Sequence, residues 1–261
     1  MVLCVDRGRR KLLEKGIALD FDEVVRRVEA LDRSQVSVGT IGEAFGYDIR
    51  ALKVGKRTEG KREILMTGGV HGDEPAGVEA VLSFLEGPVE AYLDAYCFSV
   101  IPCVNPSGLE LGTRANKAGQ DINRAMSDDS VTESVLLRRY TKGRHYAVFF
   151  DHHEDYEATG FYMYEAERED RLIGARIVEA IKEFGPIDGD DNTDQGLDMP
   201  ISEGLFGINP KWGKQGWSAY AYYENSNHVV LCETPSTAWP LEQRVRAHRV
   251  AQTMTLDHYL K

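Results

Sequence analysis

Short apolar runs alternate with segments of helical spacing along most of the chain, and this alternation limits the folds open to it. Strands alternating with helices predict a mostly parallel sheet covered on both faces, in which ligands bind at the carboxyl ends of the strands. We therefore expect an α/β fold with a mostly parallel mixed sheet and helices on both faces. The strands are predicted within residues 35–39, 47–54, 63–70, 96–104, 146–150 and 229–232, and the helices within residues 21–31, 76–85, 131–142, 169–184 and 241–260.

Composition narrows the class of protein. A chain of 261 residues can bury one substantial core, so we expect a single domain, residues 1–261. The net charge of -11 argues against nucleic acid as a partner, because such binders display clustered positive charge. No apolar run approaches the roughly 20 residues that span a bilayer, and residues 1–16 lack the apolar region of a signal peptide, which favours a cytoplasmic protein without a membrane partner.

The first candidate site follows the apolar run that ends in GGVHGDE. His71 and Glu74 stand three residues apart, and Pro75 after them suits the first turn of a helix. An imidazole nitrogen and a carboxylate are ligands of zinc hydrolases of the two-His-one-Glu kind, which leave a fourth position open for water. A single short match is weak evidence, so this motif requires a third ligand elsewhere.

The run AVFFDHHED, residues 147–155, offers that ligand at a strand end, where two histidines compete. If the strand continues regularly, Asp151 and His153 lie on one face and His152 on the other. Asp151 could then orient the ring of His153, as carboxylates commonly do for metal-bound histidines. We therefore predict His153 as the third ligand and His152 as a core residue or a support for the ligands.

A third apolar run ends in Glu233, within VVLCETPS. A lone carboxylate at this position could act as a general base. Cys232 beside it could be a nucleophile, but burial is the usual fate of a cysteine in an apolar run. The cysteines show no CxxC spacing and are expected to be reduced: Cys4, Cys97, Cys103 and Cys232.

The segment 104–126, VNPSGLELGTRANKAGQDINRAM, completes an ordered set with HGDE before it and HHED and CETPS after it. With these motifs the chain resembles the zinc carboxypeptidases of the carboxypeptidase A type, from about residue 38 to the C-terminus. The resemblance is strongest to short bacterial members such as murein-peptide amidases. Aspartoacylase and succinylglutamate desuccinylase relatives share the metal motif and match the middle segment less well.

This resemblance implies a zinc-dependent hydrolase of the carboxypeptidase-like α/β fold. His71, Glu74 and His153 would bind one zinc ion per chain, and Glu233 would act as general base and proton shuttle.

The resemblance also implies roles for three residues of the middle segment. Arg114 would polarise the scissile carbonyl and stabilise the oxyanion. Asn123 and Arg124 would grip a terminal carboxylate, for which a guanidinium offers two hydrogen bonds. The expected activity is hydrolysis of the amide bond next to the C-terminal carboxylate of a peptide or a murein-type peptide. The alternative is deacylation of an N-acyl amino acid, with the same metal chemistry.

Two features leave the substrate open. The family commonly continues its Asn-Arg with another Asn and an aromatic residue, whereas this chain continues with Ala125 and Met126. Residues 185–228 are irregular in sequence and are expected to wall the substrate pocket, with the acidic stretch 188–194 as a solvated turn rather than a calcium loop. Any of several aromatic residues in this region could cover the site: Trp212, Trp217, Tyr220, Tyr222 and Tyr223.

Overall fold

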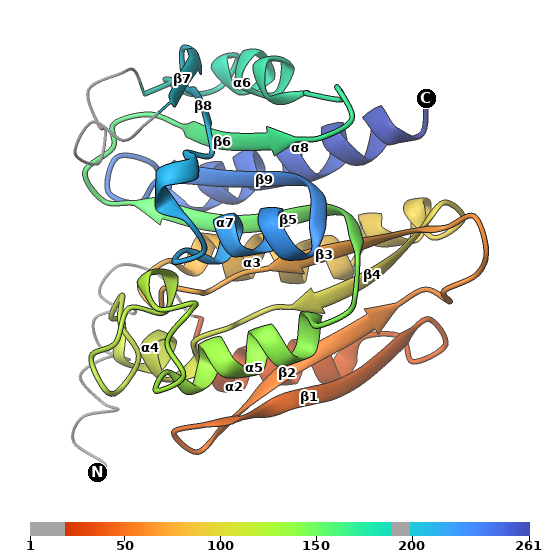
Figure 1. Cartoon of the computed structure of the whole chain (residues 1–261), viewed down its shortest axis with the longest axis vertical. Helices are drawn as coiled ribbons and strands as arrows, with labels where there is room; N and C mark the ends of the chain where they lie inside the picture. Colours follow the sequence, from red (N-terminus) through yellow and green to blue (C-terminus); the bar gives the residue numbers. More distant parts are fainter. Residues whose placement is uncertain (1–18, 189–198) are drawn as a thin grey trace.

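The structure is a computed structural model that describes residues 19–188 and 199–261, and its centre is a nine-stranded mixed sheet (Figure 1). The strand order across the sheet is β1-β2-β4-β3-β5-β9-β6-β8-β7. The strands are β1 (Val36–Ala44), β2 (Tyr47–Val54), β3 (Arg62–Thr67), β4 (Tyr96–Ile101), β5 (Tyr146–Asp155), β6 (Tyr162–Glu167), β7 (Met199–Ser202), β8 (Leu205–Gly207) and β9 (Ser226–Pro235).

The four central strands, β4, β3, β5 and β9, are parallel to one another, as the alternating sequence pattern predicts. The margins depart from that pattern, because β2 pairs antiparallel with β4, β1 with β2, and β6 with β9. The predicted α/β fold with a mixed sheet is confirmed. The parallel centre aligns the carboxyl ends of β3, β5 and β9 at one edge.

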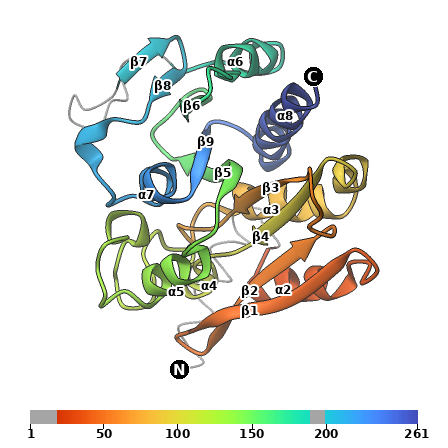
Figure 2. The same cartoon turned by 45° about the vertical axis from the view of Figure 1, so that its right-hand side comes forward.

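Helices cover both faces of this sheet, as the turned view shows (Figure 2). The described helices are α2 (Phe21–Ala30), α3 (Pro75–Leu85), α4 (Pro106–Leu111), α5 (Thr132–Thr141), α6 (Gly174–Lys182), α7 (Trp217–Glu224) and α8 (Leu241–Tyr259), with the short 3-10 turns η1 (Pro88–Tyr92), η2 (Ile122–Arg124) and η3 (Pro210–Trp212). Helix α3 packs between α2 and α8 on one face, while α5 and α7 lie on the other (Figure 1). Each face has its own apolar core.

Local chemistry explains where several elements begin. The Asp20 carboxylate caps α2, because its Oδ1 accepts the amide hydrogen of Glu23 at 2.8 Å. Helix α6 starts five residues later than predicted, since the buried carboxylate of Glu165 accepts the amides of Ile173 and Gly174, both at 2.8 Å. The pattern also missed β6, which carries that carboxylate.

Strands β5 and β9 are longer than predicted and extend through the polar residues at their ends. Their pairing is continuous to Asp155 and Pro235, so the regular alternation required for the predicted placement of His153 is present. Expectations for residues 1–18, including Cys4, and for residues 189–194 of the acidic stretch lie outside the described residues. Across residues 19–188 and 199–261, no helix has both the length and the apolar character needed to cross a bilayer.

The buried carboxylate of Glu154 joins β5 to two helices of one face, α3 and α8. Helix α3 has no side-chain cap of its own, and Glu154 on β5 instead accepts the amide hydrogen of Ala76 at 2.8 Å. The other oxygen of Glu154 accepts a hydrogen bond from Nη1 of Arg244 on α8. Both side chains are buried, so this carboxylate fixes the start of α3 against the sheet.

Replacement of Arg244 by methionine leaves the charge of Glu154 buried without its partner. We expect Arg244→Met to lower the free energy of unfolding by about 3–5 kcal/mol, measured by urea denaturation. The double variant Arg244→Met/Glu154→Gln keeps an acceptor for Ala76 and removes the charge, so it should recover part of that loss. Arg246→Met on the exposed side of α8 is the control, and an equal loss in this variant contradicts the prediction.

Candidate metal centre

Two segments that are distant in the sequence bring three ligand-type side chains together at the carboxyl edge of the sheet. The chain leaves β3 at Thr67 and turns into α3, and His71 and Glu74 lie in this turn. His153 comes from the neighbouring strand β5. The three residues are buried, and one ligand atom of each lies within 4.8 Å of the others. The structure therefore brings together the three residues that the sequence predicted as metal ligands.

The geometry of this cluster fits a small cation. The Nδ1 atoms of His71 and His153 are 3.2 Å apart, and each faces one oxygen of Glu74, at 2.5 and 2.9 Å. Tetrahedral zinc with bonds of about 2.0–2.1 Å separates its ligand atoms by about 3.3 Å. Two unprotonated ring nitrogens at this separation repel each other and the carboxylate, whereas a cation between them removes that repulsion.

Nε2 of each histidine, the ring nitrogen remote from Glu74, faces a second carboxylate. This contact favours the tautomer that carries its proton on Nε2. Nε2 of His71 is 3.3 Å from Oδ1 of Asp121, and Nε2 of His153 is 3.3 Å from Oδ2 of Asp151. The second contact is an ion pair without the alignment of a hydrogen bond. A carboxylate behind a histidine holds the proton on Nε2 and leaves the Nδ1 lone pair for a metal. Sequence reasoning anticipated Asp151 but missed Asp121, although this residue begins the DINR motif.

Electrostatics within the cluster favour ionised carboxylates and a charged ring. Burial opposes ionisation of Glu74, but His71 and His153 outweigh it and hold the pKa of this carboxyl below its usual range. Burial likewise opposes a charge on His153, yet Asp151 and Glu74 raise its pKa well above the usual value. Without a metal, the cluster therefore takes up positive charge as a proton, and a bound cation would replace this proton.

Glu233 lies on the same face of the sheet as His153, because the two residues are paired in the parallel ladder of β9 and β5. Burial raises the pKa of Glu233 to about 8; the charges of Glu74 and Asp155 add to this effect, while His153 and Arg114 oppose it. A carboxyl with a pKa near neutrality suits a proton acceptor.

Arg114 reaches the cluster from the exposed loop after α4. Its Nε donates a hydrogen bond to Oδ2 of Asp121 at 2.9 Å, and its Nη1 is 3.7 Å from Oε1 of Glu74. Because Asp121 contacts both His71 and Arg114, one carboxylate links a predicted ligand to the predicted oxyanion-stabilising residue. Burial opposes ionisation of Asp121, but these two neighbours hold its pKa below the usual range.

Asn123 and Arg124 lie in η2, directly after Asp121. Asn123 is half-buried and Arg124 is exposed. The Asp121 side chain accepts the amide hydrogen of Asn123 at 2.9 Å, which fixes the start of this turn next to the cluster. Met126, two residues after the DINR motif, is fully buried and its amide donates to the carbonyl of Gln215 at 3.0 Å.

The glycines of the HGDE and NPSG motifs allow two turns to approach closely. A Cβ atom on Gly72 would lie 1.9 Å from the carbonyl carbon of Gly108, so a larger residue at position 72 would force the two turns apart. Asn105 begins α4 and its Oδ1 accepts the amide hydrogen of Gly108 at 2.8 Å. This packing holds the middle segment against the turn that carries His71.

His152 and Cys232 are core residues, as the sequence predicted. Nδ1 of His152 donates to the carbonyl of Thr67 at 2.7 Å, and its ring packs against His248 on the face opposite His153. Burial strongly raises the pKa of the Cys232 thiol, which disfavours a nucleophilic role. Among the described cysteines, Cys97, Cys103 and Cys232 are free and buried.

Trp217 is fully buried, so it is excluded as a mobile cover among the aromatic candidates. Tyr220 stacks on Trp217, Trp212 contacts Tyr164, and Tyr223 is exposed.

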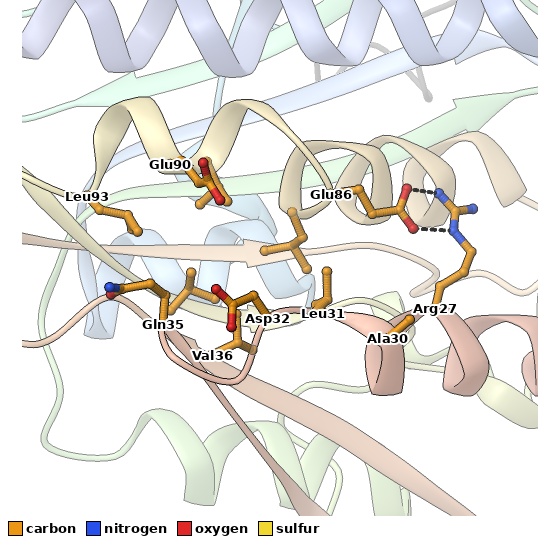
Figure 3. A pocket seen from close by; sticks show the side chains of 12 residues that line it. Arg27, Ala30, Leu31, Asp32, Gln35, Val36, Glu86, Glu90 and Leu93 are labelled. Carbon is orange, nitrogen blue, oxygen red and sulfur yellow. Dashed lines mark hydrogen bonds and ion pairs between the residues drawn. The ribbon is translucent and has the colours of Figure 1, made fainter.

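A surface pocket of about 210 Å³ lies away from this centre, between α2 and the C-terminal end of α3 (Figure 3). The centre is at the other end of α3, a helix of 11 residues and therefore about 16 Å long. The pocket has an apolar floor that includes Leu31 and Leu85, and Arg27 at its rim binds Glu86 through two hydrogen bonds of 2.6 Å. Its lining contains neither histidine nor cysteine, so this pocket offers none of the nitrogen or sulfur ligands that zinc prefers.

Comparisons with known proteins agree with this geometry. The profile of the zinc carboxypeptidase family matches residues 22–154, about half of the chain. The chain therefore belongs to the zinc carboxypeptidase family of metal-dependent hydrolases. No curated protein matches the chain. The family match ends at Glu154, so the placement of Glu233 depends on the pairing of β9 rather than on the profile.

Solved structures share the fold at low sequence identity. A candidate metallopeptidase from Shewanella amazonensis has a TM-score of 0.74 and 21% identity, over 91% of this chain and 90% of its own. A metallo-carboxypeptidase from Pseudomonas aeruginosa has a TM-score of 0.63 and 19% identity, over 92% and 68%. Bovine thrombin-activatable fibrinolysis inhibitor has a TM-score of 0.66 and 15% identity, over 93% and 97%.

Removal of one ligand-type side chain from the cluster should abolish stoichiometric metal binding. We expect wild-type protein to hold one zinc ion per chain after reconstitution and dialysis, measured by elemental mass spectrometry, and His71→Ala to lose it because two ligands remain. His145→Ala, at an exposed position before β5, is the matched control and should retain zinc. Retention of zinc by His71→Ala would contradict this ligand set.

Proposed function

We propose that this protein is a zinc-dependent metallocarboxypeptidase that hydrolyses the amide bond next to a free C-terminal carboxylate. The observation that carries the proposal is the pairing of Glu233 with His153, which aligns a proton acceptor with the metal cluster on one face of the sheet. His71, Glu74 and His153 hold one zinc ion, which polarises a carbonyl and lowers the pKa of a water molecule when bound.

Glu233 acts as the general base and then as the general acid. It removes a proton from the attacking water and delivers this proton to the nitrogen of the leaving amine. The half-buried position of Glu233 and its raised pKa support this role, because the carboxyl can both accept and release a proton near neutrality.

Arg114 stabilises the negative charge that develops on the carbonyl oxygen. Nε of Arg114 donates a hydrogen bond to Asp121, and this contact fixes the orientation of the guanidinium and of its two outer nitrogens. A permanently charged and oriented donor is well suited to an oxyanion, because no reorganisation is needed during the reaction.

Asn123 and Arg124 bind the substrate carboxylate and thereby restrict cleavage to chain ends. The position of η2 immediately after Asp121 supports this assignment, since Asp121 also contacts His71. The Pseudomonas aeruginosa structure contains a succinic acid derivative, a ligand that carries carboxylates. A peptide with a free carboxylate, either ordinary or of the murein type, is the substrate class we infer.

Removal of the base should stop catalysis without loss of the metal. We expect Glu233→Gln to lower kcat for a C-terminally free peptide by about 10²- to 10⁴-fold, because the amide cannot accept the proton. Zinc content should stay at one per chain. The control is Glu183→Gln at an exposed position after α6, and near-normal turnover by Glu233→Gln would refute the assigned role.

The binding of the substrate carboxylate by Arg124 can be tested with matched substrates. We expect Arg124→Ala to raise KM for a peptide with a free C-terminus by about 10- to 150-fold, which corresponds to one charged hydrogen-bond interaction of about 1.5–3 kcal/mol. A C-terminally amidated peptide should react poorly with both proteins and show little further loss in the variant. Arg139→Ala on the exposed side of α5 controls for net charge.

Hydrolysis of N-acyl amino acids provides the decisive comparison with the alternative activity. Both reactions use the same metal chemistry, but the substrate of the deacylase is a single N-acylated amino acid rather than a peptide. Cleavage of acyl amino acids together with inactivity toward a broad peptide library would replace the carboxypeptidase proposal with that alternative.

A further inference from the structure

The first turn of α7 contacts Asn123 and Asp151, although it comes from residues 185–228, which are irregular in sequence. The backbone amide of Trp217 donates to Oδ1 of Asn123 at 2.8 Å. The hydroxyl of the next residue, Ser218, donates to Oδ2 of Asp151 at 2.7 Å. Two consecutive residues thus contact Asn123, which is predicted to bind the substrate carboxylate, and Asp151, whose carboxylate faces Nε2 of His153.

A second path connects the same turn to Asp151. The indole Nε1 of Trp217 donates to Oγ1 of Thr67 at 3.2 Å, and this hydroxyl donates in turn to Oδ1 of Asp151 at 3.0 Å. Both oxygens of Asp151 are therefore held by hydroxyl donors. The carboxylate has one orientation, in which Oδ2 is 3.3 Å from Nε2 of His153.

The network is buried, which strengthens its hold on the carboxylate. Trp217, Thr67 and Asp151 are 0% exposed and Ser218 is 5% exposed. The indole ring also packs edge-on against Phe149 of β5, with 5.3 Å between ring centroids. Inside a protein, hydrogen bonds of this kind are little weakened by water, and loss of one donor leaves a buried acceptor without its partner.

The contact with Asn123 fixes the orientation of its amide group. A backbone N–H can donate only to the carbonyl half of that amide, so Oδ1 must face Trp217. This contact occupies the acceptor half of the amide and leaves its NH₂ half as a donor. A donor is the group that a carboxylate ligand requires.

We propose that Trp217 and Ser218 form a positioning element that sets the orientation of His153 through Asp151 and of Asn123 through its amide. This inference rests on the proposed metal centre and extends it: a turn outside the motifs determines how tightly the centre binds its metal. Neither residue belongs to the ligand cluster of His71, Glu74 and His153. Both act through Asn123 and Asp151.

The direct test measures metal affinity without turnover. Zinc affinity is determined by competition with a chromophoric chelator, and the coordination geometry is followed by the visible absorption of the Co²⁺-substituted protein. We expect Ser218→Ala and Thr67→Val each to weaken zinc binding about 3- to 10-fold and to alter the Co²⁺ spectrum, below the range of about 10- to 100-fold for direct partners of ligands. Ser226→Ala removes an equally buried hydroxyl at the start of β9 and should change neither quantity.

A double-mutant cycle tests whether the effect passes through Asp151. In an Asp151→Asn background, Ser218→Ala should weaken zinc binding by less than twofold, because the carboxylate that it orients is absent. If Ser218→Ala has its full effect in both backgrounds, or none in either, the inference is wrong. Thermal melting of the metal-free proteins identifies any variant that fails to fold, and Thr67→Val then replaces Ser218→Ala in the cycle.

The indole contact has a matched control within the chain. Trp217→Phe removes the Nε1 donor, whereas Trp239→Phe removes a buried Nε1 that has no hydrogen-bond partner among the described residues. We expect only Trp217→Phe to shift the Co²⁺ spectrum. Equal spectra for the two variants would overturn a positioning role for Trp217.

These measurements separate the inference from the proposed function. If wild-type protein binds zinc and cleaves peptides while all network variants bind zinc normally, the inference fails and the function stands. If the variants weaken zinc binding as expected but no peptide is cleaved, the proposed function fails and the positioning role stands. If wild-type protein binds no zinc, both are refuted.

Discussion

The parallel pairing of β5 with β3 on one side and β9 on the other is the constraint on which the site depends. It brings the end of β3, and the turn with His71 after it, beside His153 and Glu233. These polar side chains lie near or just after the ends of strands whose apolar residues are buried in the two cores. The energy that assembles the sheet therefore also brings together His71, Glu74 and His153, whose lone pairs repel one another unless a proton or a metal ion lies between them.

Because successive side chains of β5 point to opposite faces of the sheet, residues that support the site lie on both faces. Asp151 and His153 face α7, where hydroxyl donors hold the carboxylate. His152 and Glu154 face α3 and α8, where Glu154 caps the helix that begins just after Glu74. One strand thus provides a ligand on one face and fixes the backbone of the other ligands from the opposite face.

Much of this arrangement could be predicted from the sequence. Apolar runs that end in polar residues indicated β3, β5 and β9, and strand alternation distinguished His153 from His152. The late start of α6 could not be predicted, because it depends on a cap from Glu165 on another element. Strand β6 pairs antiparallel with β9, and this long-range pairing has no signature in its own short sequence.

The sequence by itself determined the fold class and the chemical identity of the cluster, because strand and helix periods and ligand types are properties of local residues. Only the tertiary structure decided that Asp121 faces His71 and that Ser218 holds Asp151. These contacts join residues separated by 50 and 67 positions. Their existence depends on how the turn after α4 and the start of α7 pack onto the sheet, and no local pattern encodes that packing.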